Sequence, residues 1–86
     1  MKVIKQLEAA IDTLNQKKGT PATSYSKKID GKFQANIGNF HLSQAYSGNR
    51  LDQMANESGG IHVISLGGYI PKRELLDQIN EMINIL

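Results

Sequence analysis

Apolar residues recur at helical spacing near the N-terminus of the chain. They fall on one arc of about 120° at ~100° per residue, which predicts an amphipathic helix. The apolar stripe consists of Val3, Ile4, Leu7, Ala10, Ile11 and Leu14. Lys17 and Lys18 are cations that suit the C-terminal end of a helix, where the helix dipole is negative. Gly19 readily adopts the left-handed backbone conformation that ends helices, so we expect the helix to end at this point.

The C-terminal segment has the same pattern. Its stripe consists of Leu75, Leu76, Ile79, Met82, Ile83 and Leu86. Pro71 suits the first turn of a helix, because its missing N–H costs nothing there. Both terminal helices therefore need one core against which their stripes can be buried.

The middle of the chain alternates apolar and polar residues with a period of two, which is typical of strands. The alternating segments are residues 24–29, 32–37 and 40–46. Asp30-Gly31 and Gly38-Asn39 are turn signals between these segments. We therefore expect a three-stranded antiparallel meander that turns Phe33, Ala35 and Ile37 toward the core.

Two further elements are predicted between the meander and the C-terminal helix. Leu51, Met54 and Ala55 lie at helical spacing with Asn49 as an N-cap, which favours a short helix. The apolar run 61–66 predicts a fourth strand, more buried than the others. The fold class is α+β, with all 86 residues in one domain and an antiparallel meander packed by the two terminal amphipathic helices.

Length and composition narrow the classes of function. A chain of 86 residues has room for one core and buries only about 60–65% of its unfolded surface. Hydrophobic residues make up 40% and charged residues 21%, as in globular chains. The net charge of +2 is weaker than non-specific nucleic-acid binding usually needs. The chain has no cysteine, so disulfides, thiolate chemistry and cysteine-bound zinc are excluded.

The N-terminus enters an amphipathic pattern instead of an apolar signal segment. No apolar run reaches the roughly 18 residues that cross a bilayer. We therefore expect no membrane contact and a cytoplasmic location.

Candidates for catalysis are scarce. The two histidines are His41 and His62, and no serine stands in a nucleophile motif. The two histidines could meet across neighbouring strands and bind a metal together with a carboxylate. Metal sites usually show ligand pairs that are closer together in the sequence, however. Ordinary histidines on strand faces are the favoured interpretation, and we expect no enzyme activity, no metal and no cofactor.

A turn rich in glycine leads into the C-terminal helix. The predicted strand runs through Gly67 and Gly68 to a helix start that carries Lys72 and Arg73, where cations oppose the helix dipole. Exposed N–H groups and these two cations could hold a phosphate or carboxylate. The favoured alternative is a tight turn whose cations are solvated and offset by Glu74.

A basic cluster suggests nucleic-acid binding. Its members are Lys17, Lys18, Lys27, Lys28 and Lys32. Residues 1–32 carry seven cations and three anions, whereas residues 33–86 carry three cations and five anions. This asymmetry can steer a negatively charged partner. Lysines on hairpins also protect exposed edges from aggregation, so the cluster has an interpretation without a ligand.

An uncharged sheet face suggests protein binding, because the centres of interfaces are depleted of charge. The face comprises Gln34, Asn36, His41, Ser43 and Ala45. Tyr46, Tyr69 and Met54 are candidate anchors at its margin. The alternative is that one terminal helix covers this face.

The leading hypothesis is a small non-enzymatic protein-binding module, with a homodimer among the expected assemblies. Small chains without cysteine or a ligand motif are common among accessory proteins of phages and mobile elements, including inhibitors of host defence proteins. The contrasting hypothesis is a nucleic-acid-binding domain that uses the basic region 17–32, with Lys72 and Arg73 as additional candidate contacts.

Overall fold

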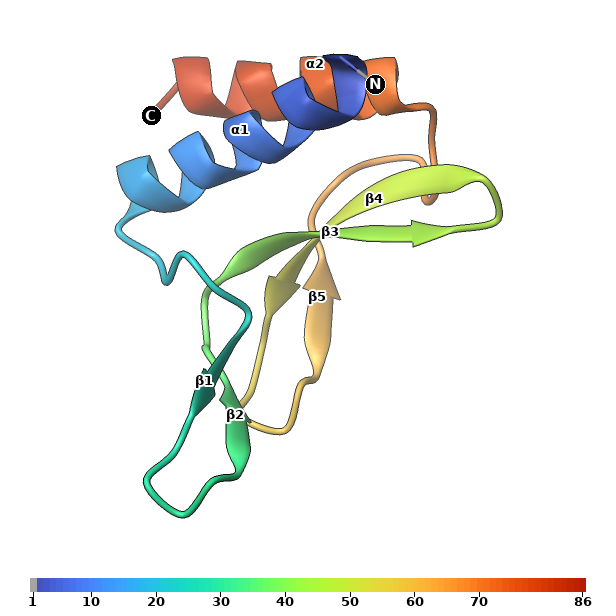
Figure 1. Ribbon diagram of the computed structural model, residues 1–86. Helices are drawn as coiled ribbons and strands as arrows, with labels where there is room; N and C mark the ends of the chain where they lie inside the picture. The colour runs from blue at the N-terminus through green and yellow to red at the C-terminus, as the bar shows by residue number, and fades with distance from the viewer. Residues whose placement is uncertain (1) are drawn as a thin grey trace.

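The computed structural model describes residues 2–86 and consists of two helices and five antiparallel strands in two sheets (Figure 1). The elements in chain order are α1 Lys2–Lys18, β1 Tyr25–Lys27, β2 Phe33–Ala35, β3 Phe40–Ala45, β4 Gly48–Met54, β5 Ile61–Val63 and α2 Lys72–Asn84. The predicted α+β class with a helix at each end is confirmed. Within residues 2–86, neither helix has the length and apolarity that crossing a membrane requires.

The two helices lie together on one face of the sheet β3–β4–β5 (Figure 1). The buried core consists of Leu7, Ala10, Ile11, Leu14, Phe40, Leu51, Ile70, Leu75, Leu76 and Ile79. Both predicted stripes therefore supply the core, and each fully buried leucine contributes about 1.5–3 kcal/mol. The side chain of Val3 lies outside the described residues, and Leu86 is exposed beyond the end of α2.

The helix α1 ends where the sequence predicts. Gly19 has a φ of 69°, and its N–H donates to the Gln16 carbonyl at 3.2 Å. The Thr20 N–H donates to the Asn15 carbonyl at 3.0 Å. These two bonds form a Schellman motif, which pairs carbonyls that the helix leaves free.

The side chain of Asn15 connects α1 to the edge of β3. It is 1% exposed, its Nδ2 donates to the Phe40 carbonyl, and its Oδ1 accepts from the Phe40 N–H, both at 2.9 Å. The Thr20 hydroxyl donates to the same Oδ1 at 2.7 Å. An amide side chain thus replaces a neighbouring strand for one residue of β3.

The predicted meander divides into two separate sheets. β1 pairs with β2, but β3 pairs with β4 and not with β2. Gly38, with a φ of 94°, turns the chain, and its N–H donates to the Met54 carbonyl at 2.8 Å. This hydrogen bond brings the chain at Gly38 beside the end of β4. The chain then continues along β4 as β3, and β2 stays outside the larger sheet.

The hairpin β1–β2 projects from the rest of the molecule (Figure 1), and we call residues 24–37 the arm. The prediction that Phe33 and Ile37 face the core is wrong, since they are 70% and 55% exposed. Ala35, at 1% exposed, is the member of that set that is buried. The arm is too far from the helices for its outer apolar side chains to reach the core.

The predicted short helix is wrong, because this segment forms the strand β4. β4 is the central strand of its sheet, so side chains on both of its faces are covered. Leu51 and Met54 are 0% and 3% exposed although a strand turns them to opposite faces. Burial on both faces removes the alternation of a half-buried strand and leaves a spacing of three that resembles a helix.

The fourth predicted strand is shorter and more exposed than expected. β5 covers Ile61–Val63 at the edge of the sheet, and all three side chains are exposed. The chain leaves the ladder soon afterwards, where the Ser65 hydroxyl accepts from the Leu51 N–H at 3.0 Å. The expectation of a buried strand at 61–66 is therefore wrong.

Replacing Asn15 tests the connection between α1 and β3. Asn15→Ala leaves the buried N–H and carbonyl of Phe40 without partners, so we expect the free energy of unfolding to fall by about 3 kcal/mol. Urea unfolding followed by circular dichroism measures it. The exposed neighbour provides a control, because Gln16→Ala should change stability by less than about 0.5 kcal/mol. Equal stability of the two variants would contradict this role of Asn15.

Candidate functional site

The turn between β3 and β4 holds two residues in the left-handed region. Tyr46 and Ser47 have φ values of 52° and 59°, and neither is glycine. A two-residue hairpin loop with positive φ at both positions is the signature of a type I′ turn, which favours Asn-Gly. Side chains at such positions cost about 1 kcal/mol or more each. The turn presents the Tyr46 side chain to solvent, where it is 92% exposed.

Tyr69 lies against this hairpin. Its ring is 5.7 Å from that of Tyr46 at an interplanar angle of 68°, and its hydroxyl is 3.1 Å from the Ser43 hydroxyl. Ile70 holds the segment in place through a two-bond bridge with Asn49, at 2.8 and 2.9 Å. These contacts put both tyrosines on the face of the sheet that points away from the helices, which we call the outer face.

Close packing beneath Tyr69 requires a glycine. A Cβ at Gly48 would lie 2.8 Å from the backbone carbonyl carbon of Tyr69, which real Cβ atoms essentially never show. The glycine therefore lets the chain that carries Tyr69 lie directly on β4.

Arg50 adds a fixed positive charge to the cluster. Its guanidinium carbon is 4.5 Å from the centre of the Tyr69 ring, within cation–π range. Two hydrogen bonds, at 2.7 and 3.0 Å, join it to the Asp52 carboxylate, which is 1% exposed. The hydrogen bond to Asp52 raises the pKa of Arg50 above its usual value, so the guanidinium stays charged. We call Ser43, Tyr46, Arg50 and Tyr69 the tyrosine platform.

The structure brings together three of the residues predicted to bind protein, namely Ser43, Tyr46 and Tyr69. His41 lies on the same outer face, opposite Asp52, and its Nδ1 is buried without a hydrogen-bond partner among residues 2–86. An unpaired buried nitrogen of this kind costs free energy without adding a contact for a partner.

The other predicted members of the uncharged face lie elsewhere. Gln34 lies on β2 in the other sheet, and Asn36 follows that strand in the arm. Asn36 donates to the Thr23 carbonyl at 3.0 Å and to the Ser26 hydroxyl at 2.9 Å. Met54 is buried at 3% exposed, so it offers no surface anchor. The predicted single face is therefore divided between two sheets.

The two histidines do not meet. His41 lies on β3 and His62 on β5, with β4 between them. His41 stands opposite Asp52 and His62 opposite Gln53, and successive residues of a strand point to opposite faces. The idea that they bind a metal across neighbouring strands is wrong, and residues 2–86 contain no cluster of three metal-binding side chains.

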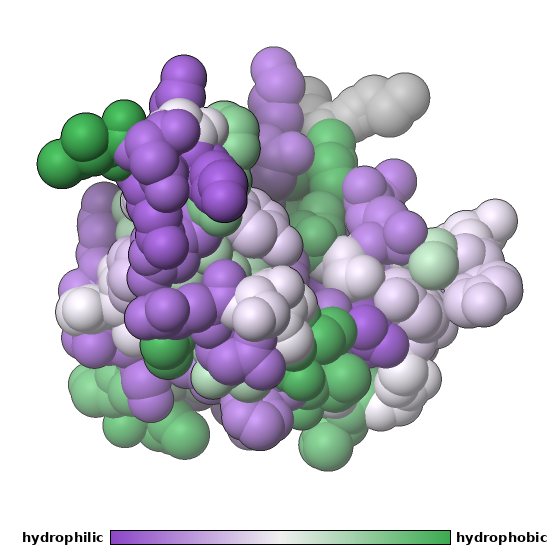
Figure 2. Space-filling view, turned by 90° about the horizontal axis from the view of Figure 1, so that it is seen from below, coloured by the Kyte–Doolittle hydropathy of each residue, from purple (hydrophilic) through white to green (hydrophobic). Residues whose placement is uncertain are grey.

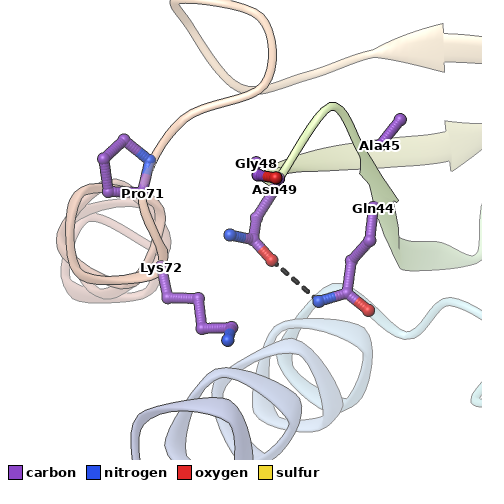
Figure 3. Close-up of a pocket in the computed structure, with 7 residues that line it drawn as sticks. Gln44, Ala45, Gly48, Asn49, Pro71 and Lys72 are labelled. Atoms are coloured by element: carbon purple, nitrogen blue, oxygen red, sulfur yellow. Dashed lines mark hydrogen bonds between the residues drawn. The ribbon is translucent and has the colours of Figure 1, made fainter.

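A cavity of about 570 Å³ lies between the β3–β4 hairpin and the first turn of α2 (Figure 3). Gln44, Asn49 and Lys72 extend into it, and the Gln44 amide donates to Asn49 Oδ1 at 2.9 Å. Pro71 precedes α2 and provides no side-chain cap. Polar and apolar surface line this cavity in similar measure, and Lys72 is the one cation among its lining residues.

The residues predicted to bind an anion are only partly brought together. Gly67 and Gly68 have positive φ values of 88° and 69° and are exposed, as is Arg73. None of these three lines the cavity that Lys72 lines. Gly67 and Gly68 lie in a bend before α2, and Arg73 lies in the first turn of that helix.

The arm carries the net charge of the chain. Lys27, Lys28 and Lys32 against Asp30 give the arm +2, and the remaining residues carry seven cations and seven anions. Lys17 and Lys18 are exposed at the end of α1. Seen from the side on which the arm projects, hydrophobic side chains form separate patches at the margins instead of one continuous surface (Figure 2).

Arg50 and Asp52 are functional candidates that sequence reasoning missed. Both lie in or beside the segment for which the sequence predicts a short helix, and turn chemistry or capping is a sufficient explanation for an acid such as Asp52 there. The alternation Arg50-Leu51-Asp52, taken as a strand, would have put both charges on one face.

Substituting Ser47 tests the strain in the turn. Glycine adopts positive φ without a steric penalty, so Ser47→Gly should raise the free energy of unfolding by about 1 kcal/mol relative to Ser47→Ala, which keeps the Cβ. Urea unfolding of the two variants measures the difference. A result in which alanine stabilises as much as glycine would show that the turn is unstrained.

Comparison with known proteins identifies no relative, since no family model, no curated protein and no solved structure matches the chain. The interpretation of its surfaces therefore depends on their own geometry and chemistry.

Proposed function

We propose that this chain is a protein-binding module that uses the tyrosine platform as its contact surface. The observation that carries the proposal is Tyr46, an aromatic side chain that is 92% exposed on a turn whose two residues both have positive φ. Positive φ at a residue other than glycine is unfavourable, and strained residues cluster at functional sites.

The composition of the platform supports this proposal. Tyrosine and arginine are enriched among the residues that dominate binding energy at protein interfaces. Arg50 and Tyr69 are already held by Asp52 and Ser43, so these two side chains lose little further freedom when a partner binds. Preorganisation of this kind favours affinity, because less conformational entropy is lost on association.

The proposed mode of action is occupation of a partner's surface without chemical conversion. An accessory protein of a phage or mobile element that inhibits a host defence protein would act in this way. A cytoplasmic location is part of the proposal, since a chain without cysteine is suited to a reducing compartment.

Site-specific crosslinking tests the proposal in cells that naturally carry the chain. A photoreactive phenylalanine derivative in place of Tyr46 should capture one protein, and the same derivative in place of the exposed Gln16 should not. With the captured protein purified, Tyr46→Ala should weaken binding by about 30-fold, the effect of losing one dominant contact. Isothermal titration calorimetry measures the affinity.

A matched variant separates the platform from the arm. Ile29 is fully exposed at the tip of the arm, and Ile29→Ala should leave the affinity within about twofold of the original value. If Ile29→Ala weakens binding and Tyr46→Ala does not, the proposed contact surface is wrong.

The arm favours a second candidate function, nucleic-acid binding. It projects from the molecule, holds the whole net charge, and exposes Phe33 at 70% beside its three lysines. Lysines bind phosphates, and exposed aromatic rings stack on bases. Three lysines on one short hairpin make this a weaker candidate than the platform.

Salt dependence tests this second candidate. If the arm binds single-stranded DNA, replacing Lys27, Lys28 and Lys32 by glutamine should reduce the slope of log K against log salt by about 2, from three lost phosphate contacts. Fluorescence anisotropy with a labelled oligonucleotide measures the slope. As matched single substitutions, Lys28→Gln should reduce the slope by about 0.7, whereas Lys5→Gln, which removes the same charge from α1, should leave it unchanged; equal losses would exclude the arm as a specific site.

A further inference from the structure

β5 leaves one edge of the larger sheet open. The Ala55 N–H donates to the Gly60 carbonyl at 2.7 Å, and the Ile64 N–H donates to the Leu51 carbonyl at 2.9 Å. Hydrogen-bonded pairs alternate along an antiparallel ladder, so His62, opposite Gln53, is the next residue bonded to β4.

The backbone groups of Ile61 and Val63 therefore point away from the sheet. Neither residue has a backbone partner outside the ladder within the described range 2–86. Their side chains are 41% and 51% exposed. Two residues thus present unpaired N–H and carbonyl groups together with apolar side chains.

Natural proteins usually protect such an edge with charges, proline or a covering element. At the opposite edge of the same sheet, Asn15 pairs with Phe40, whereas Leu42 and Gln44 have no backbone partner beyond the ladder within residues 2–86. β5 is short, which limits its reach, but residues 58–71 include no charged side chain. The open edge also continues into an apolar surface.

That surface is a groove of about 450 Å³ between the chain after β5 and α2. Its lining residues are Ile64, Leu66, Gln78, Glu81, Met82 and Ile85. Leu66 and Ile85 are 77% and 81% exposed. The edge and the groove together gather exposed apolar side chains that the monomer leaves in water.

We propose that a second copy of this chain pairs with the β5 edge, antiparallel and with the two-fold axis at His62. In this register Ile61 stands opposite Val63 of the second copy, and Val63 opposite Ile61 of the second copy. All four residues have outward-pointing backbone groups, so the pairing forms four hydrogen bonds with no change in the monomer.

A second copy fits the edge because the edge is self-complementary. The two outward residues are separated by one inward residue, so a two-fold axis at His62 matches each donor with an acceptor. Residues 58–71 contain no Asp, Glu, Lys or Arg, so the paired strand segments bring no like charges of these residues together across the two-fold axis.

The proposed dimer goes beyond the proposed function and does not depend on it. It would join the two three-stranded sheets into one sheet of six strands. Both tyrosine platforms would then lie on the same outer face, and a partner with repeated sites could engage both at once.

A single cysteine at the axis tests the register. The chain has no cysteine, and His62→Cys would bring two Cα atoms to about 4.5 Å across the axis, within the range of a disulfide. Mild oxidation should convert most of this variant to a covalent dimer on a non-reducing gel. The matched variant Ile61→Cys lies on the same strand but off the axis, and should crosslink about tenfold more slowly. Equal rates, or no dimer with His62→Cys, would overturn the proposal.

Paired charges test the same register without a covalent bond. Ile61→Lys combined with Val63→Glu puts opposite charges across the interface, whereas Ile61→Lys combined with Val63→Lys puts like charges there. The first variant should dimerise about tenfold more tightly than the second, because both cross-strand pairs differ in sign. Sedimentation velocity measures the dissociation constants, and circular dichroism checks that both variants fold. A monomeric wild-type chain, or equal constants for the two variants, would overturn the proposal.

Discussion

The buried amide of Asn15 is the contact on which the arrangement of helices and sheet depends. Phe40 directs both its N–H and its carbonyl toward α1, and an apolar side chain there would leave the two groups unpaired in the interior. α1 must therefore present an amide at one position along β3. That requirement sets the position of α1 along β3 and the rotation of α1 about its own axis. It thereby directs Leu7 and Leu14 toward α2 and the core. The Thr20 hydroxyl bonds to the same oxygen and fixes the orientation of the amide.

Two other buried asparagines hold the chain where regular strands end. Asn39, 1% exposed, donates to the Pro21 carbonyl at 2.7 Å and accepts from the Ser24 hydroxyl at 2.9 Å. Asn49, 3% exposed, holds Ile70 through both its backbone and its side chain. The first contact anchors the base of the arm, while its tip has no such support. The arm is therefore connected firmly to the core yet exposes its apolar side chains.

The helices were predictable because each buries one stripe, as Leu7 and Ile79 illustrate, and a stripe is visible in any window of the sequence. The strand β4 was not predictable, because Leu51 and Met54 are buried on opposite faces and their spacing resembles that of a helix. Strand pairing was not predictable either: whether β3 pairs with β2 or β4 depends on the Gly38–Met54 hydrogen bond between residues far apart in the chain. Asn15 gave no local signal, since a polar residue near a helix end is expected to face solvent.

The tyrosine platform was predictable only in parts, for a similar reason. Tyr46 and Tyr69 stand out singly, but they converge because Ile70 pairs with Asn49, a contact between segments 21 positions apart. The turn beside the platform and the edge of β5 have features that the fold itself does not require. A glycine at position 47 would relieve the turn, and a charge at β5 would protect its edge, yet the chain has Ser47 and an uncharged strand at these places. A small domain has little stability to spare. Strain and exposed apolar surface are both unfavourable for an isolated chain, and the contacts proposed above would offset them.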